Sequence, residues 1–429
     1  MALSWLAFLV LAPALLLHRK TRAGFLQRFG FYSAGTIPAG GWPRIWLHGA
    51  SAGDLQALAP MMRRFRLKYP DCRILVSTIT NTGFLMARER FAADLDAVLY
   101  APWDLWGATR RATRALEPHL LVLEYTELWP NLIHAAHQAG ARVVLTNGRF
   151  APDRLGAYRA LLALAGNPLR ELDLLLMRED EEAERALSLG APLERVWVTG
   201  NTKFDALGAA TLSAQDGALR DALGLASGAP LLIAGSTHEG EEEVLLSVYR
   251  RLLALHPHLK LVLAPRYIDR AARVLGLAEA AGFTAARRTA GAGATRPAQV
   301  VVLDTIGELS QAYRLATLVF VGGSFTNRGG QNILEPAAQG KPVLFGPNMA
   351  NFSDSVQVLL GRGGIQVPDA QHFETLAADL LGRPETCAQL GELAAQAVRQ
   401  VSGASQRNVD LVARMLGASP RPPPGRPAA

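Results

Sequence analysis

The sequence predicts an α/β protein built from two doubly wound domains, each a parallel sheet with helices on both faces. The chain has 429 residues, which is too long for one domain of typical size. Short apolar runs alternate with helical stretches along most of it, and this alternation is typical of parallel sheets. The alternation also starts twice, at Arg44 and again at Pro230, which predicts two domains of similar construction.

The first domain opens with an apolar strand at Arg44–His48, a turn of small residues that ends at Asp54, and a helix over Leu55–Lys68. Runs of apolar and β-branched residues bounded by turn signals predict the other strands. The further elements expected here are strands at Arg73–Thr78, Val98–Tyr100, Leu120–Glu124, Arg142–Thr146, Leu174–Met177 and Val196–Val198, and a helix near Leu105–Leu116.

The second domain opens in the same order as the first. A strand at Leu231–Ala234 leads into the turn Gly235–Glu241, and a helix over Glu242–Leu255 follows. His256-Pro257 ends that helix, because the residue before proline is disfavoured in helical conformation. Later strands are expected at Leu259–Ala264, Val300–Leu303, Leu318–Val321 and Val343–Phe345.

Composition divides the chain into five segments. Residues 1–22 form an apolar start with basic residues at its end, and residues 206–228 form a linker rich in Ala, Gly, Ser and Leu that carries one helix. The two α/β domains are expected at residues 23–205 and 229–416. Residues 417–429 are proline-rich and predicted to be disordered.

The N-terminal segment predicts a membrane anchor. Met1–Leu17 carries no charged side chain, and Arg19, Lys20 and Arg22 follow it. A signal peptide has the opposite order, with its positive charges before the apolar region. Seventeen residues are about the minimum for a membrane span, and the positive charges then place the rest of the chain in the cytoplasm. Two alternatives stay open: a helix lying in the membrane interface, and a helix docked on the protein core.

The charge and cysteine content exclude some function classes. The net charge of +7 suggests an acidic partner: nucleic acid, an anionic membrane or a phosphorylated substrate. The basic residues are scattered and form no block interleaved with aromatics, so no nucleic-acid partner is expected. Cys72 and Cys387 lie far apart, and neither a D-x-D triplet nor a metal-binding histidine pair occurs, so we expect no disulfide framework and no metal site.

The segment Phe320–Pro347 predicts an anion site. A strand is followed by a glycine-rich turn and then by an apolar helical stretch, Asn332–Gln339. Glycines let the backbone approach a phosphate, and free N–H groups at a helix start point toward it. Glu335 lies where it could hold a ribose hydroxyl. A nucleotide or nucleotide-sugar is the predicted ligand, and an ordinary strand–helix connection is the alternative.

Three side chains of the first domain follow strands and could carry chemistry. Asp54 is either a helix cap or a general base. Glu127, close behind Glu124, gives a pair of carboxylates that either contact a ligand or form structural ion pairs. Lys203 either neutralises a developing phosphate charge or is an exposed surface lysine.

Three features of the second domain follow strands or turns in the same way. Pro265-Arg266 ends a strand, and its guanidinium could clamp a phosphate. The segment Asp304–Leu309 is either a capped helix start or a backbone pocket for a nucleobase edge. His238 either contacts a ligand phosphate or packs within its turn.

The chain resembles the Kdo (3-deoxy-D-manno-octulosonic acid) transferases of lipid A biosynthesis. The resemblance rests on four motifs in order: TELWPN (Thr126–Asn131), GNTKFD (Gly200–Asp205), GSTHEGEEE (Gly235–Glu243) and NILEPAAQGKPVLFGP (Asn332–Pro347). It implies a GT-B glycosyltransferase, with two Rossmann-like domains facing a cleft, no cofactor or metal, and inversion at the anomeric carbon. The implied donor is CMP-Kdo, and the acceptor is a lipid A precursor (lipid IVA) at the cytoplasmic face of the inner membrane.

The resemblance also assigns roles to residues of this chain. It implies Asp54 as the general base, and Glu127 and Lys203 as groups that stabilise the transition state. The positions that it implies for binding CMP are Pro265, Arg266, Ile306, Gly307, Glu308, Asn332, Ile333, Leu334 and Glu335.

Two residues depart from the family pattern. The family usually has Glu where this chain has Asp54, and His where it has Gln331. Two alternatives therefore remain: a transferase for a different sugar or acceptor, and a catalytically weak relative that binds nucleotide-sugar or lipid. The sequence predicts neither the number of Kdo residues added nor the oligomeric state.

Overall fold

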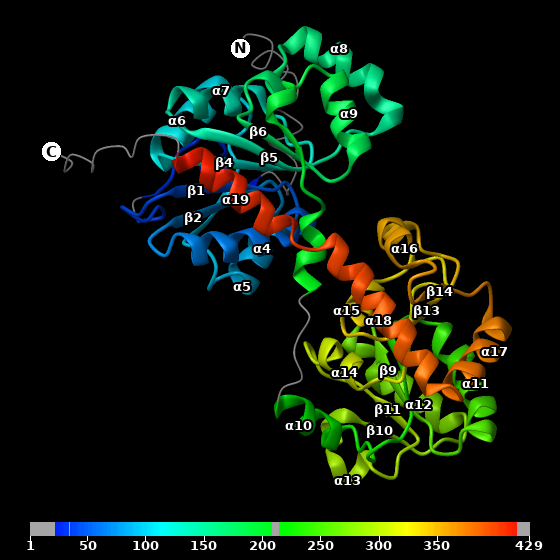
Figure 1. The fold of residues 1–429 in the computed structure, drawn as a ribbon. Helices are drawn as coiled ribbons and strands as arrows, with labels where there is room; N and C mark the ends of the chain where they lie inside the picture. The colour runs from blue at the N-terminus through cyan, green and yellow to red at the C-terminus, as the bar shows by residue number, and fades with distance from the viewer. Residues whose placement is uncertain (1–21, 34, 208–213, 418–429) are drawn as a thin grey trace. The chain divides into compact units, whose positions relative to one another are not determined.

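Two α/β units make up the chain in the computed structural model, which describes residues 22–33, 35–207 and 214–417 (Figure 1). The first unit comprises the chain up to Ala206 together with the segment from Ser402 onward. The second unit is Leu207–Val401. Each unit has its own seven-stranded parallel sheet, as the repeated strand–helix pattern predicts.

The sheet of the first unit has the strand order β3-β2-β1-β4-β5-β6-β7. Its strands are β1 (Arg44–His48), β2 (Arg73–Thr78), β3 (Ala97–Tyr100), β4 (Leu120–Glu124), β5 (Arg142–Gly148), β6 (Leu174–Met177) and β7 (Val196–Val198). Its helices are α3 (Phe25–Arg28), α4 (Ala52–Lys68), α5 (Asn81–Arg90), α6 (Trp106–Leu116), α7 (Pro130–Gln138), α8 (Leu155–Ala165), α9 (Asp180–Ser188) and α19 (Ala404–Gly417).

Helices cover both faces of this sheet, so its central strand is buried throughout. Ile45 and Leu47 of β1 pack in one core cluster, whereas Trp46, which points to the opposite face, packs in another. Alternate side chains of a strand point to opposite faces, so two separate cores identify the predicted doubly wound arrangement.

The sheet of the second unit has the order β10-β11-β9-β8-β12-β13-β14. Its strands are β8 (Leu231–Thr237), β9 (Lys260–Pro265), β10 (Ala285–Arg287), β11 (Val300–Val302), β12 (Leu318–Val321), β13 (Val343–Phe345) and β14 (Gly364–Gln366). Its helices are α10 (Ala214–Ala222), α11 (Glu241–Leu255), α12 (Ala271–Ala280), α13 (Ala292–Thr295), α14 (Leu309–Leu315), α15 (Leu334–Ala338), α16 (Ser353–Leu359), α17 (Ala370–Leu381) and α18 (Pro384–Val401).

The structure differs from the predicted domain boundary at the C-terminal end. Residues 229–416 were expected to form one domain, but the chain leaves the second unit after α18, and α19 packs on the first. Val409 and Val412 of α19 are buried in the core cluster that contains β1. Lys68 Nζ pairs with Asp410 at 2.6 Å, which ties α19 to α4. The apolar face of α19 therefore completes the first core.

The predicted linker, residues 206–228, carries the expected helix, α10, but its described part is packed. Leu219 and Leu223 are buried. Lys260 donates hydrogen bonds to the carbonyl oxygens of Gly224 at 2.8 Å and of Thr295 at 2.7 Å, so its ammonium group ties the end of this segment to the body of the second unit.

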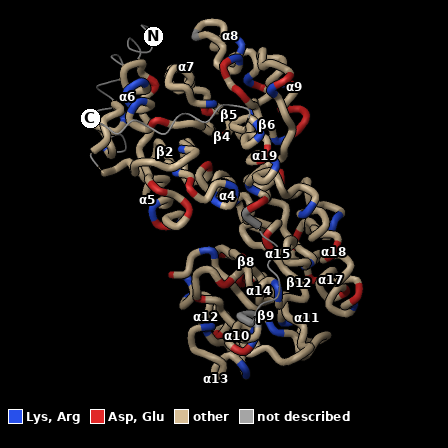
Figure 2. Tube along the Cα trace, turned by 60° about the vertical axis from the view of Figure 1, so that its left-hand side comes forward, with Lys and Arg blue, Asp and Glu red and all other residues tan. Residues whose placement is uncertain are grey.

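The predicted anchor and tail fall largely outside the described residues. Of residues 1–22 only Arg22 is described, and of residues 417–429 only Gly417. Across the described ranges, no helix is long and apolar enough to cross a membrane. Figure 2 shows basic and acidic residues interspersed along both units, in keeping with the scattered charges of the sequence.

Candidate active site

The first site lies at the carboxyl end of the first sheet, between β1 and β4. The order of the strands reverses at this pair, and such switch points are where doubly wound domains bind ligands. Asp54 lies in the first turn of α4, which follows β1. Its Oδ2 accepts a hydrogen bond from the backbone N–H of Ser51 at 2.8 Å, so Asp54 does serve as part of a helix capping box.

Glu127 is held on two sides after β4. The indole N–H of Trp129 donates to its Oε2 at 2.7 Å, and His48 Nε2 lies 3.5 Å from the same oxygen. The other ring nitrogen of His48 contacts the Ser77 hydroxyl at 2.9 Å, which fixes the imidazole from β2. Glu127 therefore has a defined position at the end of the sheet. His48, which ends the predicted strand, was given no role by the sequence interpretation.

Glu124 is the buried carboxylate of this site. Asn147 donates to its Oε1 at 2.6 Å, and its Oε2 has no hydrogen-bond partner among the described residues. Burial raises the pKa of Glu124 well above its usual range, and the charge of Asp54 adds to that shift. The Asn147 hydrogen bond and the charges of Lys203 and Arg178 act in the opposite direction.

Asp54 and Lys203 thus both lie within electrostatic reach of Glu124. Lys203 Nζ lies 5.4 Å from the centre of the Tyr125 ring, and the lysine is exposed. Tyr125 has a left-handed backbone conformation with φ 55°, which turns the chain sharply after β4. Sequence reasoning missed Asn147 and Arg178, although both directly follow or end strands, which is the signal that could have found them.

The second site lies at the corresponding switch point of the second sheet, between β8 and β12. Its centre is Glu241, the fully buried first residue of α11. Glu241 Oε2 accepts hydrogen bonds from the backbone N–H groups of His238 at 2.9 Å and Gly323 at 2.7 Å. Glu241 Oε1 accepts from those of Ser324 and Phe325, both at 3.0 Å.

One carboxylate therefore joins the turn after β8 to the glycine-rich loop after β12. The neighbouring Glu242 forms a two-point ion pair with Arg270, at 2.8 and 3.1 Å. His238 Nε2 lies 3.3 Å from the side-chain amide of Gln331, on the far side of the same loop. The sequence interpretation placed Glu241 in its turn but gave it no role, because three of its four partners lie more than 80 residues away in the chain.

The residues predicted to bind CMP all belong to the second unit and lie at the end of β9, after β11, or at the start of α15. Arg266 stacks its guanidinium 5.8 Å from the centre of the Tyr267 ring. Glu308 pairs with Arg288 at 2.7 Å, and Ile306 is 86% exposed. Gly307 has φ 90°, a conformation that favours glycine. The exposed Ile306-Gly307 turn leaves backbone groups accessible after β11.

The segment before α15 is less helical than expected. The predicted helix Asn332–Gln339 is only Leu334–Ala338, because the side chain of Asn332 accepts from the backbone N–H of Leu334 at 3.1 Å and so forms a turn first. Burial raises the pKa of Glu335, and a hydrogen bond with Ser310 partly offsets this shift. Glu335 is thus partly buried at this short helix.

Comparison with known proteins identifies the family. The family model described as "3-Deoxy-D-manno-octulosonic-acid transferase (kdotransferase)" matches residues 23–206. The 3-deoxy-D-manno-octulosonic acid transferase of Haemophilus influenzae is 32% identical over 402 residues, 92% of this chain and 91% of that protein. That of Chlamydophila psittaci is 32% identical over 88% of this chain and 87% of that protein. The chain belongs to the 3-deoxy-D-manno-octulosonic acid transferase family.

Solved structures agree with this family in fold. UDP-GlcNAc 2-epimerase from Neisseria meningitidis matches 86% of this chain and 100% of that chain, with a TM-score of 0.60 and 12% identity. A glycosyltransferase from Rickettsia africae matches 88% of this chain and 99% of that chain, with a TM-score of 0.56 and 11% identity. The fold is therefore the predicted GT-B class of two Rossmann-like α/β units.

Both departures from the family pattern lie at these two sites. Asp54 belongs to the first site, and Gln331 contacts His238 in the second. Burial lowers the pKa of His238; the charge of Glu241 opposes that shift, and the charge of Arg328 adds to it. A neutral imidazole can exchange a hydrogen bond with the neutral amide of Gln331. Within the described residues no group of three His, Cys, Asp or Glu side chains could hold a metal ion.

Proposed function

We propose that this member of the family is an inverting glycosyltransferase that moves Kdo from CMP-Kdo to a lipid A precursor during lipopolysaccharide biosynthesis. The observation that carries the proposal is the match to two 3-deoxy-D-manno-octulosonic acid transferases, each 32% identical over most of both chains. The polar cluster around Asp54 and the loop held by Glu241 supply the groups that such a reaction needs.

The first unit supplies the acid–base chemistry in this proposal. The free carboxylate oxygen of Asp54 takes the proton of a glucosamine hydroxyl. At the same time the hydroxyl oxygen attacks the anomeric carbon of Kdo. The bond from this carbon to the phosphate oxygen breaks at the same time, and CMP leaves with the electron pair. Attack opposite the leaving group inverts the anomeric centre. Glu127 and Lys203 stabilise charge in the transition state.

The second unit supplies the donor site in this proposal. Arg266 clamps the phosphate of CMP, and the exposed Ile306-Gly307 turn offers backbone groups to the cytosine edge. Glu335, partly buried at the start of α15, holds a ribose hydroxyl. Pro265, Glu308, Asn332, Ile333 and Leu334 complete the proposed CMP set.

The acceptor and the location are part of the same proposal. The lipid acceptor is inferred from the family, and the apolar N-terminal segment, residues 1–22, is proposed to anchor the protein in the inner membrane with both units in the cytoplasm. The basic residues that follow it, Arg19, Lys20 and Arg22, would then meet anionic lipid headgroups.

The test is a transfer assay with the purified full chain, CMP-Kdo and a tetraacylated lipid A precursor, read by mass spectrometry of the lipid. Addition of the mass of Kdo supports the proposal. Binding of CMP-Kdo without transfer favours the weak relative that the Asp54 and Gln331 departures suggest. Failure to bind CMP-Kdo, with binding of another nucleotide-sugar, favours a transferase for a different sugar.

A further inference from the structure

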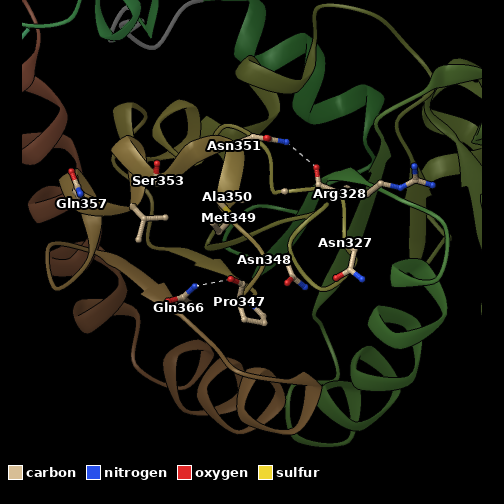
Figure 3. Close-up of a pocket in the computed structure, with 12 residues that line it drawn as sticks. Asn327, Arg328, Pro347, Asn348, Met349, Ala350, Asn351, Ser353, Gln357 and Gln366 are labelled. Carbon is tan, nitrogen blue, oxygen red and sulfur yellow. Dashed lines mark hydrogen bonds between the residues drawn. The ribbon is translucent and has the colours of Figure 1, made fainter. Parts of the chain in front are cut away.

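A cavity of about 750 Å³ opens at the carboxyl end of the second sheet, and none of the residues predicted to bind CMP lines it. Its walls come from the glycine-rich loop after β12, the segment after β13, α16 and the end of β14 (Figure 3). We name it the amide pocket, because five carboxamide side chains line it: Asn327, Asn348, Asn351, Gln357 and Gln366.

The position of the amide pocket separates it from the predicted phosphate and base contacts, whereas Asn332–Glu335 of the predicted CMP set follow the same glycine-rich loop that lines it. The predicted phosphate and base contacts, Arg266 and Ile306–Glu308, follow β9 and β11, which lie on the other side of β8 in the sheet order. The amide pocket lies beyond β12, at β13 and β14. None of the residues predicted to bind CMP lines it.

The walls of the amide pocket are fixed to each other by close packing. Gly329 and Gly330 have φ near +80°, and a Cβ atom at Gly329 would lie 2.3 Å from the Asn351 side chain. A Cβ atom at Gly330 would lie 2.4 Å from the sulfur of Met349. The Asn351 amide donates to the carbonyl oxygen of Arg328 at 3.1 Å, which joins the two walls (Figure 3). The cavity is therefore a formed feature of the fold.

The hydrogen-bonding groups of the amide pocket are only partly used. The side chains of Asn327, Asn348 and Gln357 form no hydrogen bond with the rest of the described chain. Figure 3 shows Asn327 and Asn348 on one wall and Gln357 on the other. Each free carboxamide offers both a donor and an acceptor, which suits a hydroxyl group. Among the lining residues the charged one is Arg328, and no aspartate or glutamate lines the pocket.

The apolar part of the lining complements these amides. Met349, Pro347 and Val356 give the pocket an apolar surface between its polar groups. A sugar ring combines hydroxyl edges with C–H faces, so a lining of neutral amides around apolar side chains matches it. The volume also lies within the usual range of about 300–1,000 Å³ for small-molecule sites.

We propose that the amide pocket is a saccharide subsite that binds a polyhydroxylated sugar independently of the CMP site. The sugar class follows from the lining alone. The two sugars expected for this chain, the transferred sugar acid and the glucosamine of the acceptor, rest on the proposed function and share the same hydroxyl chemistry. Binding measurements with free Kdo and with N-acetylglucosamine distinguish the transferred sugar from the acceptor sugar.

The test uses the full chain and two probes, free Kdo and N-acetylglucosamine, titrated by saturation-transfer NMR, with CMP binding measured by calorimetry. The double variant Asn327→Ala/Asn348→Ala should weaken binding of one sugar by at least about fivefold, since two hydrogen bonds are lost. Its CMP affinity should stay within about twofold. Gln371→Ala, an exposed amide of α17 outside the pocket, is the matched control and should leave both affinities unchanged.

Three results would overturn the subsite: no saturable binding of either sugar, sugar binding that the double variant leaves intact, or an equal loss of CMP binding. Saturable binding of Kdo assigns the pocket to the transferred sugar, and binding of N-acetylglucosamine assigns it to the acceptor. The transfer assay with the unmodified chain is independent of these results. A chain that transfers Kdo but shows no such binding disproves the subsite alone, and one that binds sugar here but transfers no Kdo disproves the proposed function alone.

Discussion

Asp54 Oδ2 accepts a hydrogen bond from the backbone N–H of Ser51 at 2.8 Å. This contact caps α4 and also fixes the direction of the carboxylate at the end of β1. Only one oxygen is engaged, so the capping role and a role in proton transfer are compatible. Aspartate is one methylene shorter than the glutamate usual in the family, and a misplacement of about 1 Å can cost on the order of 100-fold in rate.

Glu241→Gln should strongly destabilise the second unit. Its Oε1 and Oε2 each accept two backbone N–H groups, and an amide nitrogen in place of either oxygen leaves two buried donors without an acceptor. Each such group costs about 1–3 kcal/mol, so the two together should lower the free energy of unfolding by about 2–6 kcal/mol. Urea denaturation measures the change. Glu243→Gln, an exposed acid on the same helix, is the matched control; equal midpoints for both variants would contradict the assignment.

Glu124 should make the stability of the first unit depend on pH. A carboxyl whose pKa is raised by folding binds its proton more tightly in the folded state. The contribution of Glu124 to the free energy of unfolding is therefore fully present below the unfolded-state pKa of 4.5. It is lost as pH rises toward the pKa in the folded state. For one titrating group, the free energy of unfolding cannot change by more than about 1.4 kcal/mol per pH unit.

Glu124→Gln removes this titration and tests it. The stability of the unmodified chain relative to the Gln variant should fall as pH is raised from about 5 to about 8, measured by urea denaturation at each pH. If the stability of the unmodified chain relative to the Gln variant stays constant or rises with pH, the predicted direction of the pKa shift of Glu124 is wrong. Glu184→Gln, on the exposed side of α9, controls for the loss of one acidic residue.

Most strands were predictable from sequence because they are apolar runs between turn signals. The expected strand at Arg44–His48 is β1, and that at Leu318–Val321 is β12. The strands β10 (Ala285–Arg287) and β14 (Gly364–Gln366) were not predicted, because neither is a run of apolar β-branched or aromatic residues. The packing of α19 on the first unit was also missed, since an amphipathic pattern does not show which core its apolar face joins.

The candidate sites were predictable only in part. Residues that end or follow strands, such as Asp54 and Lys203, can be found by position alone, because carboxyl ends of parallel strands share one edge. Glu241 and His48 were missed as site residues because their significance depends on partners brought together by folding. The backbone N–H groups that surround Glu241 belong mostly to a loop more than 80 residues later in the chain.

Lys203→Met should lower kcat by on the order of 100-fold, because the ammonium group would no longer offset developing phosphate charge. Lys203 is exposed beside Tyr125, so the fold should be retained. Steady-state transfer kinetics with CMP-Kdo measure the effect. Lys68→Met, at the surface ion pair with Asp410, should keep the normal kcat. A Lys203 variant with unchanged kcat would remove this residue from the proposed mechanism.

Chelation should leave transfer unchanged. The described residues hold no cluster of His, Cys, Asp and Glu suited to a metal, and the proposed mechanism assigns charge stabilisation to Lys203 and Arg266. The purified chain dialysed against EDTA is compared with the untreated chain in the same transfer assay. Activity that is lost on dialysis and restored by a divalent cation would show that the proposed mechanism lacks a component.

The most direct test of the account is transfer of Kdo by Asp54→Asn beside the unmodified chain and Asp54→Glu. Asparagine keeps an oxygen that can accept from Ser51, so it removes the base while sparing the cap. The account predicts a fall in kcat of at least about 100-fold for Asp54→Asn, with CMP affinity within about twofold and activity retained by Asp54→Glu. Transfer by Asp54→Asn at half the normal rate or more would contradict the central claim.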